Sequence, residues 1–127
     1  MSMVSTGRSV TPVAAAALDA VIVLVFAAIG RASHDEGSAV VGVLVVAWPF
    51  LVGAAAGWAL WRWRSGRWPV DVRPGLVVWA GTLVGGILLR VVTGAGTAFS
   101  FVVVAALFLA LGLLGWRALL PRVLPRR

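Results

Sequence analysis

One acidic residue, Asp19, lies inside a long apolar segment near the N-terminus, where its carboxyl group could do chemistry. A carboxylate within a membrane-spanning segment is energetically costly and is a functional candidate by default. It could bind a proton or a cation. Alternatively, it could lock helices together by accepting a hydrogen bond from Thr82, an indole N–H or an arginine. Thr82 and Trp79 are expected at about the depth of Asp19 in neighbouring segments.

A second polar group is expected at the other side of the membrane, on one short loop and at the end of a later apolar segment. Arg90 has a stem long enough to reach outward from its segment, where Asp35 or Glu36 could pair with it. His34 belongs to a residue type that titrates near neutrality and can relay protons. One histidine crowded with two acids does not predict a metal site. The expected role of Arg31, His34, Asp35, Glu36 and Arg90 is a salt-bridged cap.

A third candidate site is the glycine-rich turn that follows Arg90. Exposed N–H groups at a helix N-terminus attract anions, and Thr97 and Ser100 add hydroxyl groups there. With Arg90 adjacent, the turn could hold an anion or a lipid headgroup. Alternatively, Thr97 is simply the N-cap of the following helix. Trp48, which precedes a proline, is a candidate to line a cavity or form a hinge.

The segments that carry these residues are apolar enough to cross a membrane. The chain has 127 residues, is 61% hydrophobic and is only 12% charged, which excludes an ordinary soluble domain. Spans are predicted at residues 13–30, 38–61, 75–93 and 97–116, each near the length that hydrocarbon requires. We therefore predict an all-α membrane protein, a single transmembrane domain over residues 1–127 with a four-helix bundle. Cleavage of the first span as a signal peptide is the alternative.

Arginine placement predicts the orientation of the bundle. The chain has eleven basic residues, all arginine, and a formal net charge of +7. Apart from Arg31 and Arg90, they lie in the N-terminal segment, the central loop and the C-terminal segment, which four spans place on one side. The positive-inside rule puts that side in the cytoplasm, with both termini. We expect a multi-pass protein of the inner (plasma) membrane whose arginines face an anionic cytoplasmic leaflet rather than a nucleic acid.

Small residues recur in the second and third spans. Residues 53–57 and 81–85 each place glycines four positions apart, a pattern that lets helix backbones approach closely. The pattern serves either packing within the bundle or a dimer face. The two halves of the chain also share a Gly-Trp pair before inner arginines, at residues 57–58 and 115–116. This echo suggests two parallel repeats of two spans.

The sequence resembles a family of small, uncharacterised four-helix integral membrane proteins, known as a domain of unknown function. The resemblance covers nearly the whole chain and implies a four-span bundle without implying an activity. Residues 96–101 are also similar to a stretch of small fluoride channels, but this chain has no asparagine, which belongs to that pore, so that function is not transferred. The matching polar and aromatic positions of the uncharacterised family are Asp19, Arg31, His34, Trp48, Pro49, Trp79 and Arg90.

No catalytic set is visible in the sequence. The chain lacks cysteine and lysine, and it has no phosphate-binding glycine loop or nucleophile–histidine–acid spacing. We expect neither an enzyme nor a bound cofactor. The expected function is a transporter or channel for a proton, ion or small solute, working as a homo-oligomer. The alternative is a structural or accessory subunit of a larger membrane complex.

Overall fold

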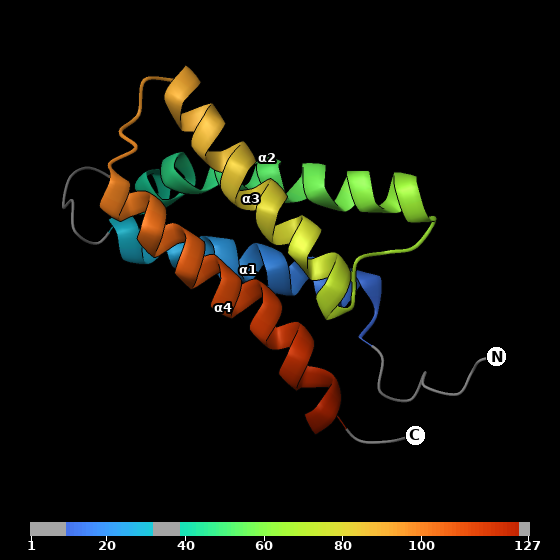
Figure 1. Cartoon of the computed structure of the whole chain (residues 1–127). Coiled ribbons are helices and arrows are strands. Elements are labelled where there is room, and N and C mark those ends of the chain that lie inside the picture. The colour runs from blue at the N-terminus through green and yellow to red at the C-terminus, as the bar shows by residue number, and fades with distance from the viewer. Residues whose placement is uncertain (1–9, 32–38, 125–127) are drawn as a thin grey trace.

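The computed structural model describes residues 10–31 and 39–124, which form four helices (Figure 1). They are α1 (Pro12–Arg31), α2 (Ala39–Ser65), α3 (Val72–Val92) and α4 (Phe99–Val123). His34, Asp35 and Glu36 lie outside the described residues. The expected all-α architecture with four helices is confirmed, and the expected ion pair of Arg90 with Asp35 or Glu36 is not described.

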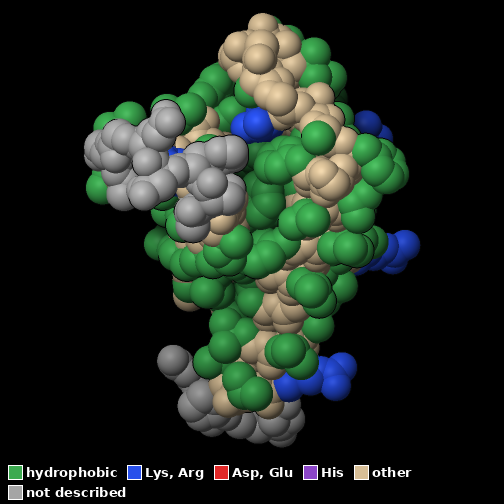
Figure 2. All heavy atoms as spheres, turned by 90° about the vertical axis from the view of Figure 1, so that its left-hand side faces the viewer, with side chains coloured by type: hydrophobic (Ala, Val, Ile, Leu, Met, Phe, Trp, Pro, Cys, Tyr) green, Lys and Arg blue, Asp and Glu red, His purple; other side chains and the backbone are tan. Residues whose placement is uncertain are grey.

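All four helices are long and apolar enough to cross a membrane. Their hydrophobic residues are not confined to the face that packs in the bundle. Many large ones are exposed on the outside of the bundle. Figure 2 shows one face of the molecule, on which hydrophobic side chains cover most of the described surface. In water such a surface would be unfavourable, whereas in a bilayer lipid chains cover it. The chain is therefore a multi-pass membrane protein.

The helices alternate in direction, and each packs against two others. α2 contacts α1 and α3, while α4 contacts α3 and α1, so the four helices form a closed ring of neighbours. The start of α1, the α2–α3 connection and the end of α4 lie at one end of the bundle (Figure 1). We call this the basic end, because the described residues place Arg62, Arg64, Arg67, Arg73, Arg117 and Arg122 towards it. Arg31 and Arg90 lie towards the opposite end.

Each helix extends further towards the basic end than the sequence predicted, α1 by one residue and α3 by three. α2 was expected to finish at Trp61 but continues to Ser65, because no helix-breaking residue occurs between Trp61 and Gly66, whose φ of 74° favours glycine. α4 was expected to finish at Trp116 but continues through Pro121. The proline lies near the end of α4, where its missing N–H removes a single helical hydrogen bond. The extension of α4 places Arg117 inside a helix.

The close packing of α2 against α3 depends on glycine. A Cβ built at Gly53 would lie 2.5 Å from the carbonyl oxygen of Gly81, and one built at Gly85 would lie 2.8 Å from Cα of Gly53. A Cβ at Gly57 would lie 3.0 Å from the carbonyl oxygen of Val77. Both small-residue patterns are thus used within the chain, as the bundle-packing interpretation predicted.

The rest of the core is aromatic towards the end opposite the basic end, and aliphatic nearer the basic end. Phe26 of α1 packs edge-on against Phe50 of α2, with 5.2 Å between ring centroids, and also contacts Phe101 and Phe108 of α4. Edge-to-face pairs of this kind add stability beyond their buried area. The remaining fully buried core residues are Val23, Ala27, Ala47, Val78, Ala105, Leu109 and Leu113.

Candidate functional site

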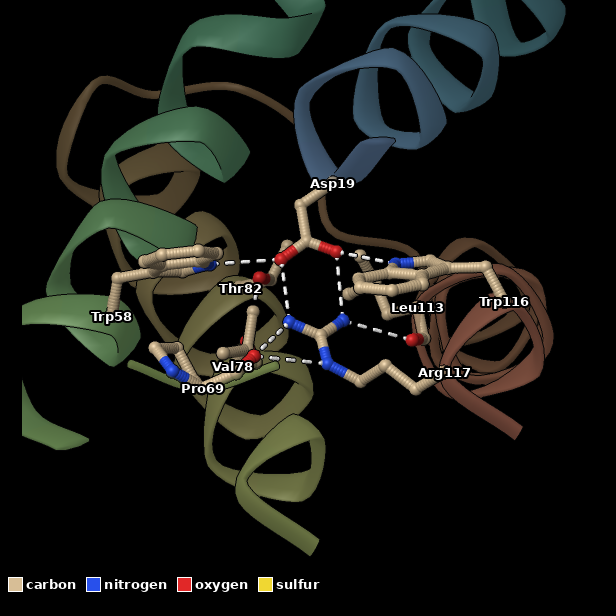
Figure 3. A network of polar contacts seen from close by, with 8 residues as sticks. All are labelled: Asp19, Trp58, Pro69, Val78, Thr82, Leu113, Trp116 and Arg117. Carbon is tan, nitrogen blue, oxygen red and sulfur yellow. Dashed lines mark hydrogen bonds and ion pairs between the residues drawn. The ribbon is translucent and has the colours of Figure 1, made fainter. Parts of the chain in front are cut away.

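Asp19 forms an ion pair with Arg117 inside the bundle (Figure 3). Nη1 of Arg117 donates to one carboxylate oxygen and Nη2 to the other, both at 2.8 Å. Asp19 is 2% exposed and Arg117 is 3% exposed. The planar guanidinium matches the planar carboxylate in a two-point contact, which is the strongest geometry available to such a pair.

Two tryptophans complete the coordination of the carboxylate. The indole N–H of Trp58 on α2 donates to Oδ2 of Asp19, and that of Trp116 on α4 donates to Oδ1, both at 2.8 Å. Each carboxylate oxygen therefore accepts one guanidinium and one indole hydrogen bond (Figure 3). An ionised carboxylate has about four acceptor positions, and all four are used here.

The guanidinium of Arg117 is also fully hydrogen-bonded on the sides that do not face Asp19. Its Nε and Nη2 donate to the carbonyl oxygen of Pro69 at 3.2 and 2.7 Å, and Nη1 donates to the carbonyl oxygen of Leu113 at 2.9 Å. With the two bonds to Asp19, all five N–H groups of the guanidinium have partners. The guanidinium carbon also lies 4.5 Å from the ring centroid of Trp116, within cation–π range.

We call Asp19, Trp58, Pro69, Trp116 and Arg117 the carboxylate cluster. It joins α1, α2, the α2–α3 connection and α4 at a single point near the basic end. Asp19 lies about two turns, or ~10 Å, after the first residue of α1. Burying two charges is favourable only when geometry and additional hydrogen bonds offset their desolvation, and the cluster supplies both.

Thr82 and Trp79, the two residues named as possible partners of Asp19, donate to backbone carbonyl oxygens instead. The hydroxyl of Thr82 is buried near Asp19 but donates to the carbonyl oxygen of Val78 in its own helix, at 2.6 Å. The indole N–H of Trp79 donates to the carbonyl oxygen of Ala106 on α4, at 3.0 Å. Both residues were suggested only by their depth in the membrane. Contact with Asp19 also requires that the side chain point towards it from its helix.

The structure places the remaining candidates away from Asp19. Nε and Nη2 of Arg90 donate to the carbonyl oxygen of Gly96, at 2.9 and 2.6 Å, and its guanidinium carbon lies 4.6 Å from the ring centroid of Phe101. The N-cap of α4 is Ala98 and no side chain caps that helix, so the expected N-cap role of Thr97 is wrong. α4 begins two residues later than the sequence predicted. Binding of an anion by Thr97 and Ser100 stays a prediction.

Arg31 and Trp48 also lie apart from the carboxylate cluster. Arg31 ends α1, and its side chain occupies the space that a Cβ at Gly42 of α2 would need. Trp48 is 41% exposed on α2. The part of the chain that the structure describes contains no group of three or more side chains suited to hold a metal ion.

Sequence reasoning missed Arg117, the most important partner of Asp19. The predicted fourth span ended at Trp116, so Arg117 was assigned to a polar tail outside the membrane. One signal pointed to the cluster, namely the Gly-Trp pair that occurs once in each half of the chain. Both tryptophans of that repeated pair, Trp58 and Trp116, donate to Asp19.

The comparisons with known proteins agree with this architecture. Residues 16–120 match a family model described as "Protein of unknown function (DUF3054)". The chain belongs to the DUF3054 family. The matched region of this DUF3054 protein contains the whole carboxylate cluster, and the resemblance to an uncharacterised membrane family is confirmed. The comparisons with curated proteins and with solved structures found no match.

Replacing Trp58 with phenylalanine is expected to lower the free energy of unfolding by about 1–2 kcal/mol, because one buried charge-assisted hydrogen bond is lost. Trp61 on the same helix provides a matched control. Its buried indole N–H has no partner among the described residues, so Trp61→Phe removes similar ring area without removing a bond. Unfolding of both variants in mixed micelles checks this, and equal losses would contradict the assigned role of the Trp58 N–H.

Proposed function

We propose that this protein is a small carrier of the inner membrane, in which the carboxylate cluster forms a gate at the cytoplasmic side. The arginines of the basic end support a cytoplasmic location for that end, by the positive-inside rule. Both termini then face the cytoplasm, and the helices of one or more copies surround the pathway of a small solute.

The observation that carries this proposal is the buried, fully bonded pair of Asp19 and Arg117. Stability alone gives little reason for such a pair, because well-packed hydrophobic residues often serve equally well or better. Ionisable residues within membrane spans are rare, and they mark substrate or ion pathways, proton relays, voltage sensors or ligand counter-ions. This pair also joins helices that must separate if a pathway is to open at the basic end.

The alternative of an accessory subunit has less support. That hypothesis relied on glycine faces that would pack against a larger complex. Gly53, Gly57, Gly81 and Gly85 instead pack against backbone of the neighbouring helix in the same chain. They are therefore not available for a partner without separating α2 from α3.

A labelling experiment tests the gate. Because the chain has no cysteine, Ala54→Cys introduces a single reactive thiol at a buried position of α2, one turn from Trp58 on the side away from the basic end. In inside-out vesicles, a membrane-impermeant maleimide should label this thiol slowly when the cluster is intact. Adding Asp19→Leu and Arg117→Leu together should speed labelling about tenfold, the effect of a ~1.4 kcal/mol shift towards an open state.

The control for this experiment is a measurement showing that the variant remains folded. Thermal unfolding of the triple variant must begin well above the labelling temperature, so that unfolded protein does not supply the reactive thiol. Equal labelling rates with and without the cluster would show that it only holds the helices together, and the gate proposal would fail.

A further inference from the structure

The four N–H groups that surround the carboxylate of Asp19 come from two helices other than its own. They belong to Arg117, Trp116 and Trp58, and each donates at 2.8 Å (Figure 3). All four converge on one planar carboxylate group, two on each oxygen. A site built only from donors, including a guanidinium, selects an anion and rejects a cation. The two-point donor geometry matches a planar carboxylate, which is the group that it holds here.

We propose that these N–H groups form a binding site for a small carboxylic acid, which the side chain of Asp19 occupies when no ligand is bound. Asp19 is then an internal stand-in for the ligand. The proposal deepens the proposed carrier function, because the gate would open when a free carboxylate replaces the tethered one.

Charge balance dictates how the exchange proceeds. The site carries one positive charge, that of Arg117, and accommodates one negative charge in a medium where an extra charge is costly. A ligand therefore enters as the neutral acid. Its carboxyl O–H bond breaks as the proton moves to Asp19, where a new carboxyl O–H bond forms, and the ligand stays behind as the anion on Arg117. Each bound carboxylate thus brings one proton with it.

Apart from Asp19 and Arg117, no titratable side chain of the described residues forms a hydrogen bond or an ion pair within this site. α4 contributes Arg117, α2 contributes the indole of Trp58, and α3 contributes the hydroxyl of Thr82, which is bonded to Val78. The ion pair with Arg117 is the sole salt bridge among residues 10–31 and 39–124. Asp19 is consequently the group that must accept the proton, and binding should increase as the pH falls.

The surroundings limit the size of the ligand. Val78 and Leu113 are fully buried beside the cluster, as is Val23 one turn from Asp19. The space released when Asp19 moves away is therefore about the size of its own side chain. Formate and acetate fit this description, and large aromatic or branched acids do not.

Equilibrium binding of radiolabelled acetate to the wild-type protein in detergent is the decisive test. We expect saturable binding at pH 5 that falls at least about tenfold at pH 8, because one proton is bound with each ligand. The Asp19→Leu/Arg117→Leu double variant should lose it, whereas Arg122→Gln, which removes an exposed arginine at the same end, should retain it. Absence of saturable binding at pH 5, or its retention in the double variant, would overturn the proposal.

Chemical rescue provides the second measurement. Asp19→Gly removes a group that acetate closely replaces, so sodium acetate should raise the unfolding temperature of this variant by several degrees. Sodium chloride at equal ionic strength should not, and neither should acetate when Arg117→Leu is added. Rescue of the variant without acetate binding to the wild type would show a site that Asp19 never leaves, and would overturn the proposal.

These measurements separate the two proposals. Acetate binding tests only whether the donor groups hold a carboxylate. Maleimide labelling of Ala54→Cys tests whether the bundle opens at the basic end. Binding with unchanged labelling would retain the carboxylate site and reject the gate. Faster labelling without binding would retain the gate and reject the carboxylate site.

Discussion

Replacing Arg117 with leucine is expected to destabilise the protein by about 3–5 kcal/mol, the largest effect of any single substitution in the carboxylate cluster. The variant leaves the carboxylate of Asp19 buried without its counter-charge, and it also removes the donors to Pro69 and Leu113. An unpaired buried charge costs far more than the net contribution of the pair. Unfolding in mixed micelles with increasing sodium dodecyl sulfate measures the loss.

The double variant Asp19→Leu/Arg117→Leu distinguishes a buried charge from a general packing defect. It should recover at least about 2 kcal/mol of the loss, because no charge remains buried. Recovery should be incomplete, since the indole N–H groups of Trp58 and Trp116 then lack their acceptor. A double variant as unstable as Arg117→Leu would mean that the shape of the arginine, not its charge, matters at this site.

Gly53→Leu is expected to have the second-largest effect, a loss of about 3 kcal/mol or more. Its Cβ would lie 2.5 Å from the carbonyl oxygen of Gly81, and backbone cannot move aside as a flexible side chain does. α2 and α3 must therefore separate along the line where they pack most closely. The midpoint of thermal unfolding, followed by tryptophan fluorescence, measures the effect.

Gly115→Leu is the matched control for this substitution. A Cβ at Gly115 meets no atom within 4 Å, so the same change of residue type should be tolerated in α4. Replacing a helical glycine even restricts the unfolded chain and improves helix propensity. If both variants unfold alike, the close approach of α2 and α3 does not limit stability.

The sequence alone was sufficient to predict the four helices, because each span is long, apolar and separated from the next by polar or glycine-rich residues. The ends of the spans were harder to place. Arg62 and Arg64 extend α2 beyond its predicted end, since arginine is a good helix former as well as a marker of the membrane surface. Pro121 looked like a stop signal but is tolerated near the end of α4.

The partners of Asp19 could be predicted by type but not by identity. An indole N–H and an arginine were both anticipated, and the carboxylate indeed binds two indoles and one guanidinium. Choosing among seven tryptophans and eleven arginines requires the rotation of each helix about its own axis. That rotation depends on how all four helices pack together, which the depth of a residue along its span does not reveal.

The separation of Asp19 and Arg117 along the chain affects how the protein is made. The two residues are 98 positions apart, on the first and last helices. At a synthesis rate of about 5–20 residues per second, Asp19 waits roughly 5–20 s for its partner to be translated. A nascent or truncated chain therefore holds an acid in the bilayer without its counter-ion.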